Sequence, residues 1–447
     1  MGSKAKSVPS IAGHEFCKPS SGISNAYENS EEQDVKTQEI PQFGLLSGYR
    51  VVMIGLSVAG PFAGELYAEH GADVIWIENP TVPDMGRFSC HAGSTQQDRR
   101  NMRSLAMNYL KGEGREAFLE LLKTTDVLIE ASVGGRFEKY GLGDEVLWEV
   151  NPRLVIAHIS GFGQTGVPEY VKRASYDPIA QAFGCVMRMN GLAGQPSAPA
   201  MVFPGDYSAA FYAFGMTAAA LLKRQETGKG ESIDVAQFEA LMRMQSQYAI
   251  NGWRFGEEYV KEGNHSLICA LYGTYTCKDG EEVYVLFLGP GVLKAGLPLI
   301  GLEYGSELFP EGEGIIPYGS HAADVAEEAF ATFLAQHTAE EVEDILANNG
   351  VPCSRLMGYA DAARDPQYQA RGVVARWTAT DGKTELPGVK VVPELKNNPG
   401  MIWRGAPCIG QDNEDILEEL GFSDERIARM YEDRMLGQRS YEESFAE

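Results

Sequence analysis

Long apolar runs are missing from this 447-residue sequence. No stretch approaches the roughly 20 consecutive apolar residues that a helix needs to cross a bilayer. The N-terminal residues also lack the apolar centre of a secretory signal. We therefore expect a cytoplasmic protein without a membrane partner.

Basic residues are scarce as well. The sequence contains 38 Lys and Arg against 62 Asp and Glu, which gives a formal net charge of -24. A surface this acidic repels polyphosphate backbones, so we expect no nucleic-acid partner.

Clusters of metal-binding residues and several catalytic motifs are absent too. The sequence has seven widely spaced cysteines without a CxxC pair, and seven scattered histidines without an HExxH motif. These spacings predict reduced thiols and no metal site. Neither a Walker A motif nor a G-x-S-x-G nucleophile motif occurs. The cysteines are Cys17, Cys90, Cys185, Cys269, Cys277, Cys353 and Cys408; the apolar neighbours of Cys185 and Cys269 suggest core thiols.

Strand and helix patterns alternate along the first half of the chain. Hydrophobic residues make up 44% of the sequence, enough for a large core. Short β-branched runs alternate with helical apolar spacing, which predicts an α/β fold with a parallel sheet and helices on both faces. We expect strands at 49–55, 72–79, 127–132 and 153–163, and helices at 61–71, 116–126, 176–191 and 207–228.

The pattern changes near residue 251. Residues 273–289 look like a hairpin with its turn at Asp279-Gly280, and residues 326–350 are helical by pattern, so a smaller α+β domain is predicted there. Short strands return near residue 370. Residues 1–42 are polar without apolar periodicity, which is typical of a flexible extension.

Glycines follow the first predicted strand. Gly55, Gly60 and Gly64 stand where a strand leads into a helix, a place at which phosphates often bind. Their spacing departs from G-x-G-x-x-G, so a tight turn with close helix packing explains them better than a dinucleotide site.

Two groups of basic residues contrast with the acidic background. Arg99, Arg100 and Arg103 precede a strand-like segment, and Arg136 and Lys139 follow the strand at 127–132. Ligands bind at strand ends in α/β sheets, so the groups form either a ligand site or an ordinary solvated surface.

Asp206 follows Pro204-Gly205 and precedes a long apolar helix. A carboxylate there either caps the helix through backbone N–H groups or acts as a nucleophile beside an apolar wall. The two roles are compatible.

Many segments, in order, resemble the class III CoA-transferases (the CaiB/BaiF family). The resemblance runs from about residue 43 to 432 and is most marked toward the L-carnitine CoA-transferases, which move CoA between crotonobetainyl-CoA or γ-butyrobetainyl-CoA and carnitine. The resembling segments are 45–79, 99–132, 147–166, 176–184, 203–214, 224–244 and 399–417.

The resemblance implies a homodimer of two interlocked, ring-shaped chains. Each chain would have a large Rossmann-like CoA-binding domain and a small α+β domain. The predicted bounds are an extension at 1–42, the large domain at 43–235 completed by 370–432, a linker at 236–254, the small domain at 255–365 and a polar tail at 433–447 that frays.

The resemblance also assigns the reaction. Asp206 matches the family's aspartate nucleophile, which attacks an acyl-CoA thioester, forms a mixed anhydride and then an aspartyl-CoA thioester. Acyl-CoA and a carnitine-type carboxylate are then the substrates, and no permanently bound cofactor or metal is expected.

Candidate CoA contacts follow by position. Where carnitine-type relatives place a lysine and an arginine for the CoA phosphates, this sequence has Val133 and Tyr140, with Arg136 and Lys139 beside them as substitutes. The candidate contacts are Ser57, Val58, Arg103, Met107, Asn108, Ala131, Ser132, Arg136 and Lys139.

Other readings stay open. An acyl-CoA racemase of the same superfamily needs a histidine base in a Gly-His-Asp triplet, and this chain reads Ser175-Tyr176-Asp177. A transferase for another acid, such as a bile acid or a dicarboxylate, and a noncatalytic CoA-ester-binding protein are the remaining alternatives.

Overall fold

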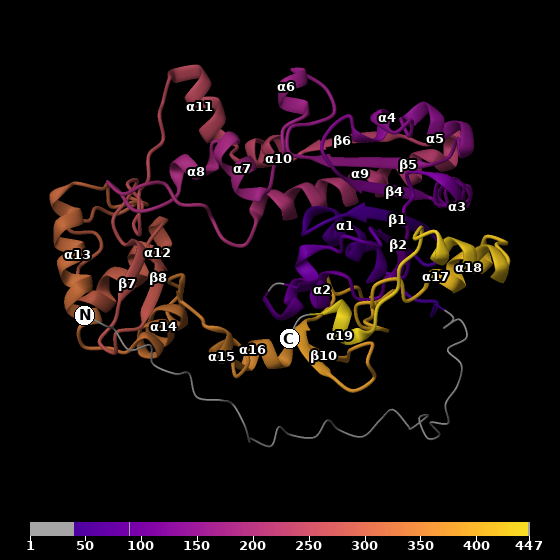
Figure 1. Cartoon of the computed structure of the whole chain (residues 1–447). Helices are drawn as coiled ribbons and strands as arrows, with labels where there is room; N and C mark the ends of the chain where they lie inside the picture. Colours follow the sequence, from indigo (N-terminus) through magenta and orange to yellow (C-terminus); the bar gives the residue numbers. More distant parts are fainter. Residues whose placement is uncertain (1–39, 89, 446–447) are drawn as a thin grey trace, which may run out of the picture. The chain divides into compact units, whose positions relative to one another are not determined.

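A six-stranded parallel sheet forms the centre of the fold (Figure 1). The computed structural model describes residues 40–88 and 90–445, so the predicted extension lies almost wholly outside the described residues. The strand order is β3-β2-β1-β4-β5-β6, which is the order of dinucleotide-binding α/β folds. The predicted parallel sheet is confirmed, with strands β1 (Arg50–Gly55), β2 (Asp73–Glu78), β3 (Arg103–Ala106), β4 (Val127–Ala131), β5 (Val155–Ser160) and β6 (Ser232–Ala236).

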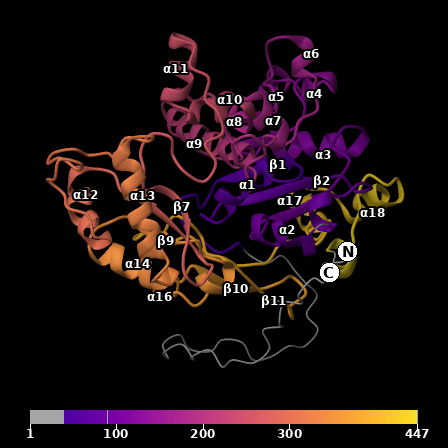
Figure 2. The same cartoon turned by 90° about the vertical axis from the view of Figure 1, so that its left-hand side faces the viewer.

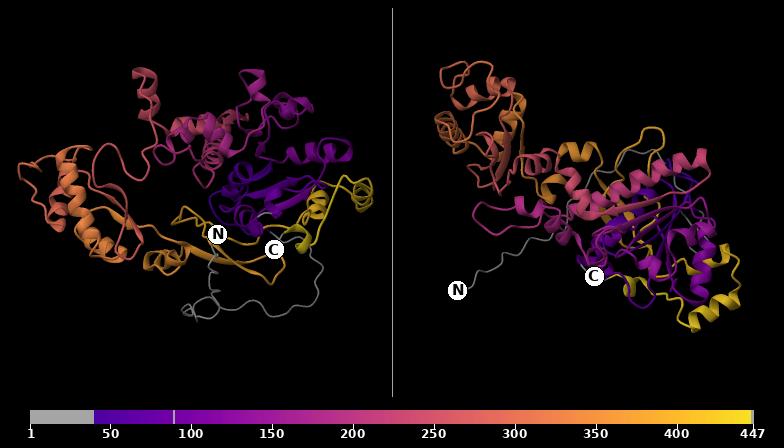
Figure 3. Two further views of the ribbon diagram at one scale, coloured as in Figure 1. Left: turned by 60° about the vertical axis from the view of Figure 1, so that its left-hand side comes forward. Right: turned by 90° about the horizontal axis from the view of Figure 1, so that it is seen from above.

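Helices cover both faces of this sheet, as predicted (Figure 3). Successive strand residues point to opposite faces, so Val51 and Met53 join one buried cluster while Val52 joins the other. The helices of the first cluster are α1 (Ala59–Ala68) and α9 (Pro204–Thr227); those of the second include α3 (Gly112–Leu122), α5 (Asp144–Val150), α17 (Asn413–Glu419) and α18 (Asp424–Glu432).

The β1–α1 glycines serve close packing, which agrees with the simpler interpretation of their spacing. A Cβ atom on Gly60 would lie 2.9 Å from the Cβ of Ala131, and one on Gly55 would lie 3.1 Å from it. Only glycine lets α1 approach β4 this closely.

A second, antiparallel sheet occupies the region in which the small domain is predicted. The predicted hairpin is present as β7 and β8, and β9 completes the sheet. Helices lie beside these strands and share one buried cluster with them (Figure 2). The domain bounds themselves stay a prediction. The elements are β7 (Tyr272–Thr276), β8 (Glu282–Leu286), β9 (Cys353–Arg355), α12 (Pro290–Gly296), η3 (Leu297–Ile300), α13 (His321–Leu334) and α14 (Ala339–Asn348).

The remaining elements are short. An antiparallel pair, β10 (Val374–Thr378) with β11 (Glu385–Val389), confirms the strands expected near residue 370. No helix in the described ranges is both long and apolar enough to span a membrane. The other helices are η1 (Met85–Phe88), η2 (Cys90–Ala92), α2 (Gly93–Asp98), α4 (Arg136–Lys139), α6 (Pro168–Val171), α7 (Asp177–Phe183), α8 (Val186–Met189), α10 (Gln237–Met244), α11 (Gln247–Phe255), α15 (Tyr359–Ala362), α16 (Pro366–Ala370) and α19 (Tyr441–Ser444).

The C-terminal segment is packed rather than frayed over residues 433–445. Leu436 forms a β-bridge with Met107. Ser444 and Phe445 are buried, and the Ser444 hydroxyl accepts the backbone N–H of Ile409 at 2.9 Å. The tail was predicted to fray because most of its residues are polar, and this composition does not reveal the few residues that anchor it.

Candidate active site

Asp206 lies in the first turn of α9, but it is not the helix cap that the sequence suggested. The helix begins at Pro204, and Phe203 occupies the capping position with a φ of 56°. Proline suits a first helical position because its missing N–H has no partner there in any case. The helix therefore starts earlier than expected, and Asp206 sits at its third residue with 8% of its surface exposed.

Two side chains define the surroundings of Asp206. Gln237, the first residue of α10, donates its side-chain N–H to Oδ1 of Asp206. Asp177, the first residue of α7, accepts the backbone N–H of Gly205 at 2.6 Å and that of Asp206 at 3.3 Å. The amide from Gln237 orients the carboxylate of Asp206, and Asp177 holds the backbone of residues 205 and 206.

The pKa of Asp206 is strongly perturbed. Burial, with the nearby negative charge of Asp177, raises the pKa of Asp206 to about 7, while the hydrogen bond from Gln237 opposes this rise. A carboxyl group that titrates near neutrality in a cavity is a candidate for catalysis.

A cavity of about 530 Å³ opens beside Asp206 at the carboxyl ends of β1, β2, β4 and β5. This edge is where open α/β sheets bind their ligands. The structure brings eight of the ten predicted site residues to its walls: Ser57, Val58, Met107, Asn108, Ala131, Ser132, Arg136 and Asp206.

The other two predicted contacts do not line this cavity. Arg103 begins β3, so it lies at the amino end of the strand, and it pairs with Asp73 at 2.7 Å and Glu419 at 2.6 Å. The Lys139 ammonium lies over the ring of Tyr140 at 5.7 Å. The position along the strand, which the sequence pattern did not resolve, separates Arg103 from the ligand edge.

Arg99 and Arg100 also serve the fold. Both are almost fully buried. Arg99 pairs with Asp84 at 2.5 Å, and Arg100 pairs with Glu69. Burial and pairing contradict the alternative of a solvated basic surface at these two positions.

The family whose model matches this chain is described as CoA-transferase family III, and the match covers residues 46–413. The chain belongs to this family. It is therefore a class III CoA-transferase, as the resemblance in the sequence implied.

Known proteins agree with this membership. The bile acid CoA-transferase BaiK of Clostridium scindens is 41% identical over 392 residues, which are 87% of this chain and 88% of that protein. The solved structure of a CAIB/BAIF family protein from Brucella suis matches with a TM-score of 0.71 at 28% identity, over 85% of this chain and all of that one. Rv3272 from Mycobacterium tuberculosis shares the fold, with a TM-score of 0.70 at 20% identity over 84% of this chain and all of that one.

A buried ionic network supports one wall of the transferase cavity. Ser132 donates its hydroxyl to Glu130 at 2.5 Å, and Glu130 pairs with His158 at 2.7 Å. His158 also contacts Asp144 at 2.9 Å. Burial alone would lower the pKa of His158, but the bonds to Asp144 and Glu130 outweigh it and raise the pKa to about 10. The imidazole is therefore a fixed cation at neutral pH.

Three of the cavity residues that the sequence reasoning missed carry polar or charged side chains of interest here: Gln237, Arg173 and Arg434. Gln237 directly follows β6, so the rule that ligands gather at strand ends could have found it. Arg173 and Arg434 also line the cavity, but they stand in loops far from the predicted basic groups. No sequence pattern signals that they meet there.

The triplet Ser175-Tyr176-Asp177 does not provide racemase chemistry. Tyr176 is 58% exposed at the cavity, and Asp177 is buried and bonded to backbone amides and to Gln181. No histidine is among the described residues that line the cavity. The base that proton exchange requires is missing from this wall.

The free thiols differ from one another. Cys185 is exposed, in contrast to the expected core position, whereas Cys269 is buried and burial raises the pKa of its thiol. Cys185 occupies a left-handed turn between α7 and α8, where its apolar neighbours do not enclose it. Among the residues described, no group of three His, Cys, Asp or Glu side chains is placed to hold a metal.

Proposed function

We propose that this chain transfers CoA from a bile acyl-CoA thioester to a free bile acid, with Asp206 as the nucleophile. The observation that carries the chemistry is the position of Asp206: a carboxylate that is 8% exposed, in a cavity at the ligand edge of the sheet. The 41% identity to the Clostridium scindens bile acid CoA-transferase supports the substrate class.

The reaction begins when an oxygen of Asp206 attacks the thioester carbonyl. The C–S bond breaks, CoA leaves as the thiolate, and a mixed anhydride of Asp206 and the donor acid remains. The thiolate then attacks the aspartyl carbonyl, which releases the donor acid as a carboxylate and leaves an aspartyl-CoA thioester. The acceptor acid reverses both steps, so the thioester bond energy is kept and Asp206 is regenerated.

The surroundings of Asp206 suit these steps. Because burial removes bulk water, the anhydride is protected from hydrolysis. Gln237 holds Oδ1 of Asp206, which leaves Oδ2 as the attacking atom.

A bile acid is favoured over the carnitine substrate that the sequence resemblance suggested. A trimethylammonium group favours aromatic faces. The rings of Tyr109 and Tyr176 line the cavity of Asp206, so the preference for a bile acid rests on the 41% identity to the bile acid CoA-transferase.

The exposed apolar face beside the site supports the homodimer as part of this proposal. Phe211, Tyr212 and Met216 on α9 are each at least 40% exposed, and Met201 and Val202, just before the helix, are 78% and 63% exposed. A monomer seldom presents so many large apolar side chains on one segment to water. A second copy that interlocks with the first would cover it, and light scattering coupled to size exclusion tests for the dimer mass.

Trapping the covalent intermediate tests the reaction. The full-length protein is incubated with cholyl-CoA, with and without deoxycholate, and quenched with hydroxylamine before peptide mass spectrometry. A hydroxamate at Asp206 is expected, and its absence while deoxycholyl-CoA accumulates would refute the nucleophile. The same assay with carnitine or succinate as acceptor tests the substrate class, because equal rates with these acids would overturn the bile acid assignment.

A further inference from the structure

Three arginines line the cavity without a carboxylate partner. Arg136, Arg173 and Arg434 form no ion pair with any described residue, whereas the buried Arg87, Arg99, Arg100 and Arg103 are all paired. In a chain with a net charge of -24, unpaired cations on one cavity are a local exception that favours an anionic ligand.

Arg434 occupies a position that normally belongs to glycine. The helix α18 ends in a Schellman motif: the N–H of Met435 binds the carbonyl of Met430 at 2.8 Å, and the N–H of Arg434 binds that of Tyr431 at 3.0 Å. The residue after the cap in this motif adopts a left-handed backbone, and glycine is the residue that does so without strain. Arg434 does so with a φ of 57°. The turn itself does not require an arginine, so the side chain of Arg434 is available to the cavity that it lines.

The segment around Arg434 is fixed to the end of β3. The N–H of Asn108 binds the carbonyl of Met435 at 2.8 Å, and the N–H of Gly437 binds that of Ala106 at 3.1 Å. Asn108 and the adjacent Tyr109 line the same cavity. Arg136 acts on the other side of this loop, where its positive charge and hydrogen bond act to lower the pKa of Tyr109 against the larger effect of burial, which raises it. Arg434 and Arg136 thus flank one loop at the cavity.

The usual phosphate site of this fold is already filled by a side chain. In dinucleotide-binding sheets, phosphate binds the N–H groups between the first strand and its helix. Here the Ser57 N–H donates to the carboxylate of Asp84 at 3.0 Å, and Arg99 pairs with that carboxylate. This N–H group and the Arg99 cation are therefore already occupied, so the phosphates of a ligand need other partners.

We propose that Arg434, together with Arg136, binds the phosphate groups of CoA. This assignment rests on the proposed function and gives the C-terminal tail a direct part in substrate binding. Bidentate guanidinium contacts suit phosphate oxygens.

The test uses Arg434→Gly in the full-length protein. Glycine relieves the left-handed strain, so thermal stability is expected to be kept or raised while the guanidinium is lost. Titration calorimetry with CoA, dephospho-CoA and pantetheine reports the contact. We expect CoA affinity to fall about tenfold or more, since a charged hydrogen bond is lost, with pantetheine affinity unchanged and Arg434→Lys intermediate. Arg429→Gly, on the exposed part of α18, is the control and should leave CoA affinity unchanged.

The outcomes separate the two proposals. A loss for CoA alone assigns the 3′-phosphate, and an equal loss for CoA and dephospho-CoA assigns the diphosphate; both support Arg434. Full CoA affinity in Arg434→Gly overturns the assignment and leaves the transferase proposal intact. If the unmodified protein shows no CoA affinity at all, the proposed function fails instead.

Discussion

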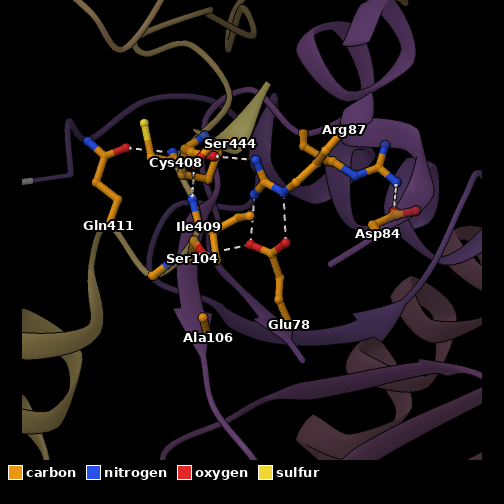
Figure 4. A network of polar contacts seen from close by, with 12 residues as sticks. Glu78, Asp84, Arg87, Ser104, Ala106, Cys408, Ile409, Gln411 and Ser444 are labelled. Carbon is orange, nitrogen blue, oxygen red and sulfur yellow. Dashed lines mark hydrogen bonds and ion pairs between the residues drawn. The ribbon is translucent and has the colours of Figure 1, made fainter. Parts of the chain in front are cut away.

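Glu78 and Asp206 are two buried carboxylates on the walls of one cavity, and they have opposite surroundings. Glu78 receives two hydrogen bonds from Arg87, at 2.8 and 2.7 Å, and a third from Ser104 at 2.7 Å (Figure 4). Asp206 has one neutral donor, Gln237, and a second carboxylate, Asp177, nearby.

We expect this difference to distinguish a structural carboxylate, Glu78, from a catalytic one, Asp206. The Glu78 network joins β2 and β3 to the C-terminal segment, because Arg87 also binds the carbonyl of Pro407 and Ser104 accepts the N–H of Gly410. A carboxylate with all its bonds satisfied is a poor nucleophile. A carboxylate with an open oxygen gains reactivity at the expense of stability.

Replacing Asp206 by asparagine should produce the largest effect. Transfer activity is expected to fall by about 10⁴-fold or more, as is usual for a lost nucleophile. The same substitution should raise the stability of the folded protein. Because the folded pKa is about 7, well above the ordinary 3.8, the native state loses stability as the pH rises between these values. Asp206→Asn does not ionise, so it should be more stable than the natural protein at pH 8 by up to about 4 kcal/mol.

Thermal unfolding at pH 4 and pH 8, beside the transfer assay, checks both effects. Asp324→Asn is the matched control, because Asp324 is an exposed carboxylate in the first turn of α13. This variant should change neither the transfer activity nor the stability. If Asp206→Asn kept its transfer activity, or were less stable than the natural protein at pH 8, the proposed difference between Asp206 and Glu78 would be contradicted.

Replacing Arg87 by methionine should lower the stability of the protein, whereas replacing Asp206 should raise it. Removing one partner of a buried ion pair leaves Glu78 uncompensated, which costs about 3–5 kcal/mol of unfolding free energy. The double variant Arg87→Met with Glu78→Gln should recover most of that loss. Denaturant titration measures both, and a loss below about 1 kcal/mol in the single variant would show that the pair is dispensable.

The sequence predicted the sheet well because buried parallel strands leave an unmistakable pattern. The run around Val51 to Met53 is apolar on both faces, and so are its neighbours. Most of the predicted site residues line the cavity for the same reason, since they follow the ends of those strands.

The sequence could not show which carboxylate pairs with each arginine, or whether an arginine lies at the amino or the carboxyl end of its strand. Arg103 and Arg136 are indistinguishable as basic residues in the sequence. Arg103, however, begins its strand and is paired with Asp73. Arg136 follows its strand and lines the cavity. Arg434 lies some 300 residues from Arg136, as the numbering shows. Only the folded chain brings its segment to Asn108.

A third buried group, His158, is a cation that contacts two carboxylates, Glu130 and Asp144. Its raised pKa of about 10 means that its contribution to stability is fully present below pH 6.5 and is lost as the pH rises through 10. His158→Gln should cost about 3 kcal/mol at pH 7, because Glu130 and Asp144 lose their shared partner. It should also abolish the decline between pH 7 and 10. Denaturant titration at several pH values measures this, and an unchanged alkaline decline in the variant would contradict the assignment.

The smallest effects should appear in the pH dependence of catalysis. Transfer needs ionised Asp206, so kcat/KM should rise with pH through about 7. Asp177→Asn removes the nearby negative charge and should move this limb to lower pH by about one unit or less. Gln237→Leu removes the bond that stabilises the ionised form and should move the limb upward by a similar amount. Shifts in the same direction would contradict the assigned roles. Opposite shifts would show that Asp206 is tuned by one charge against one amide, whereas Glu78 is held by a full set of donors.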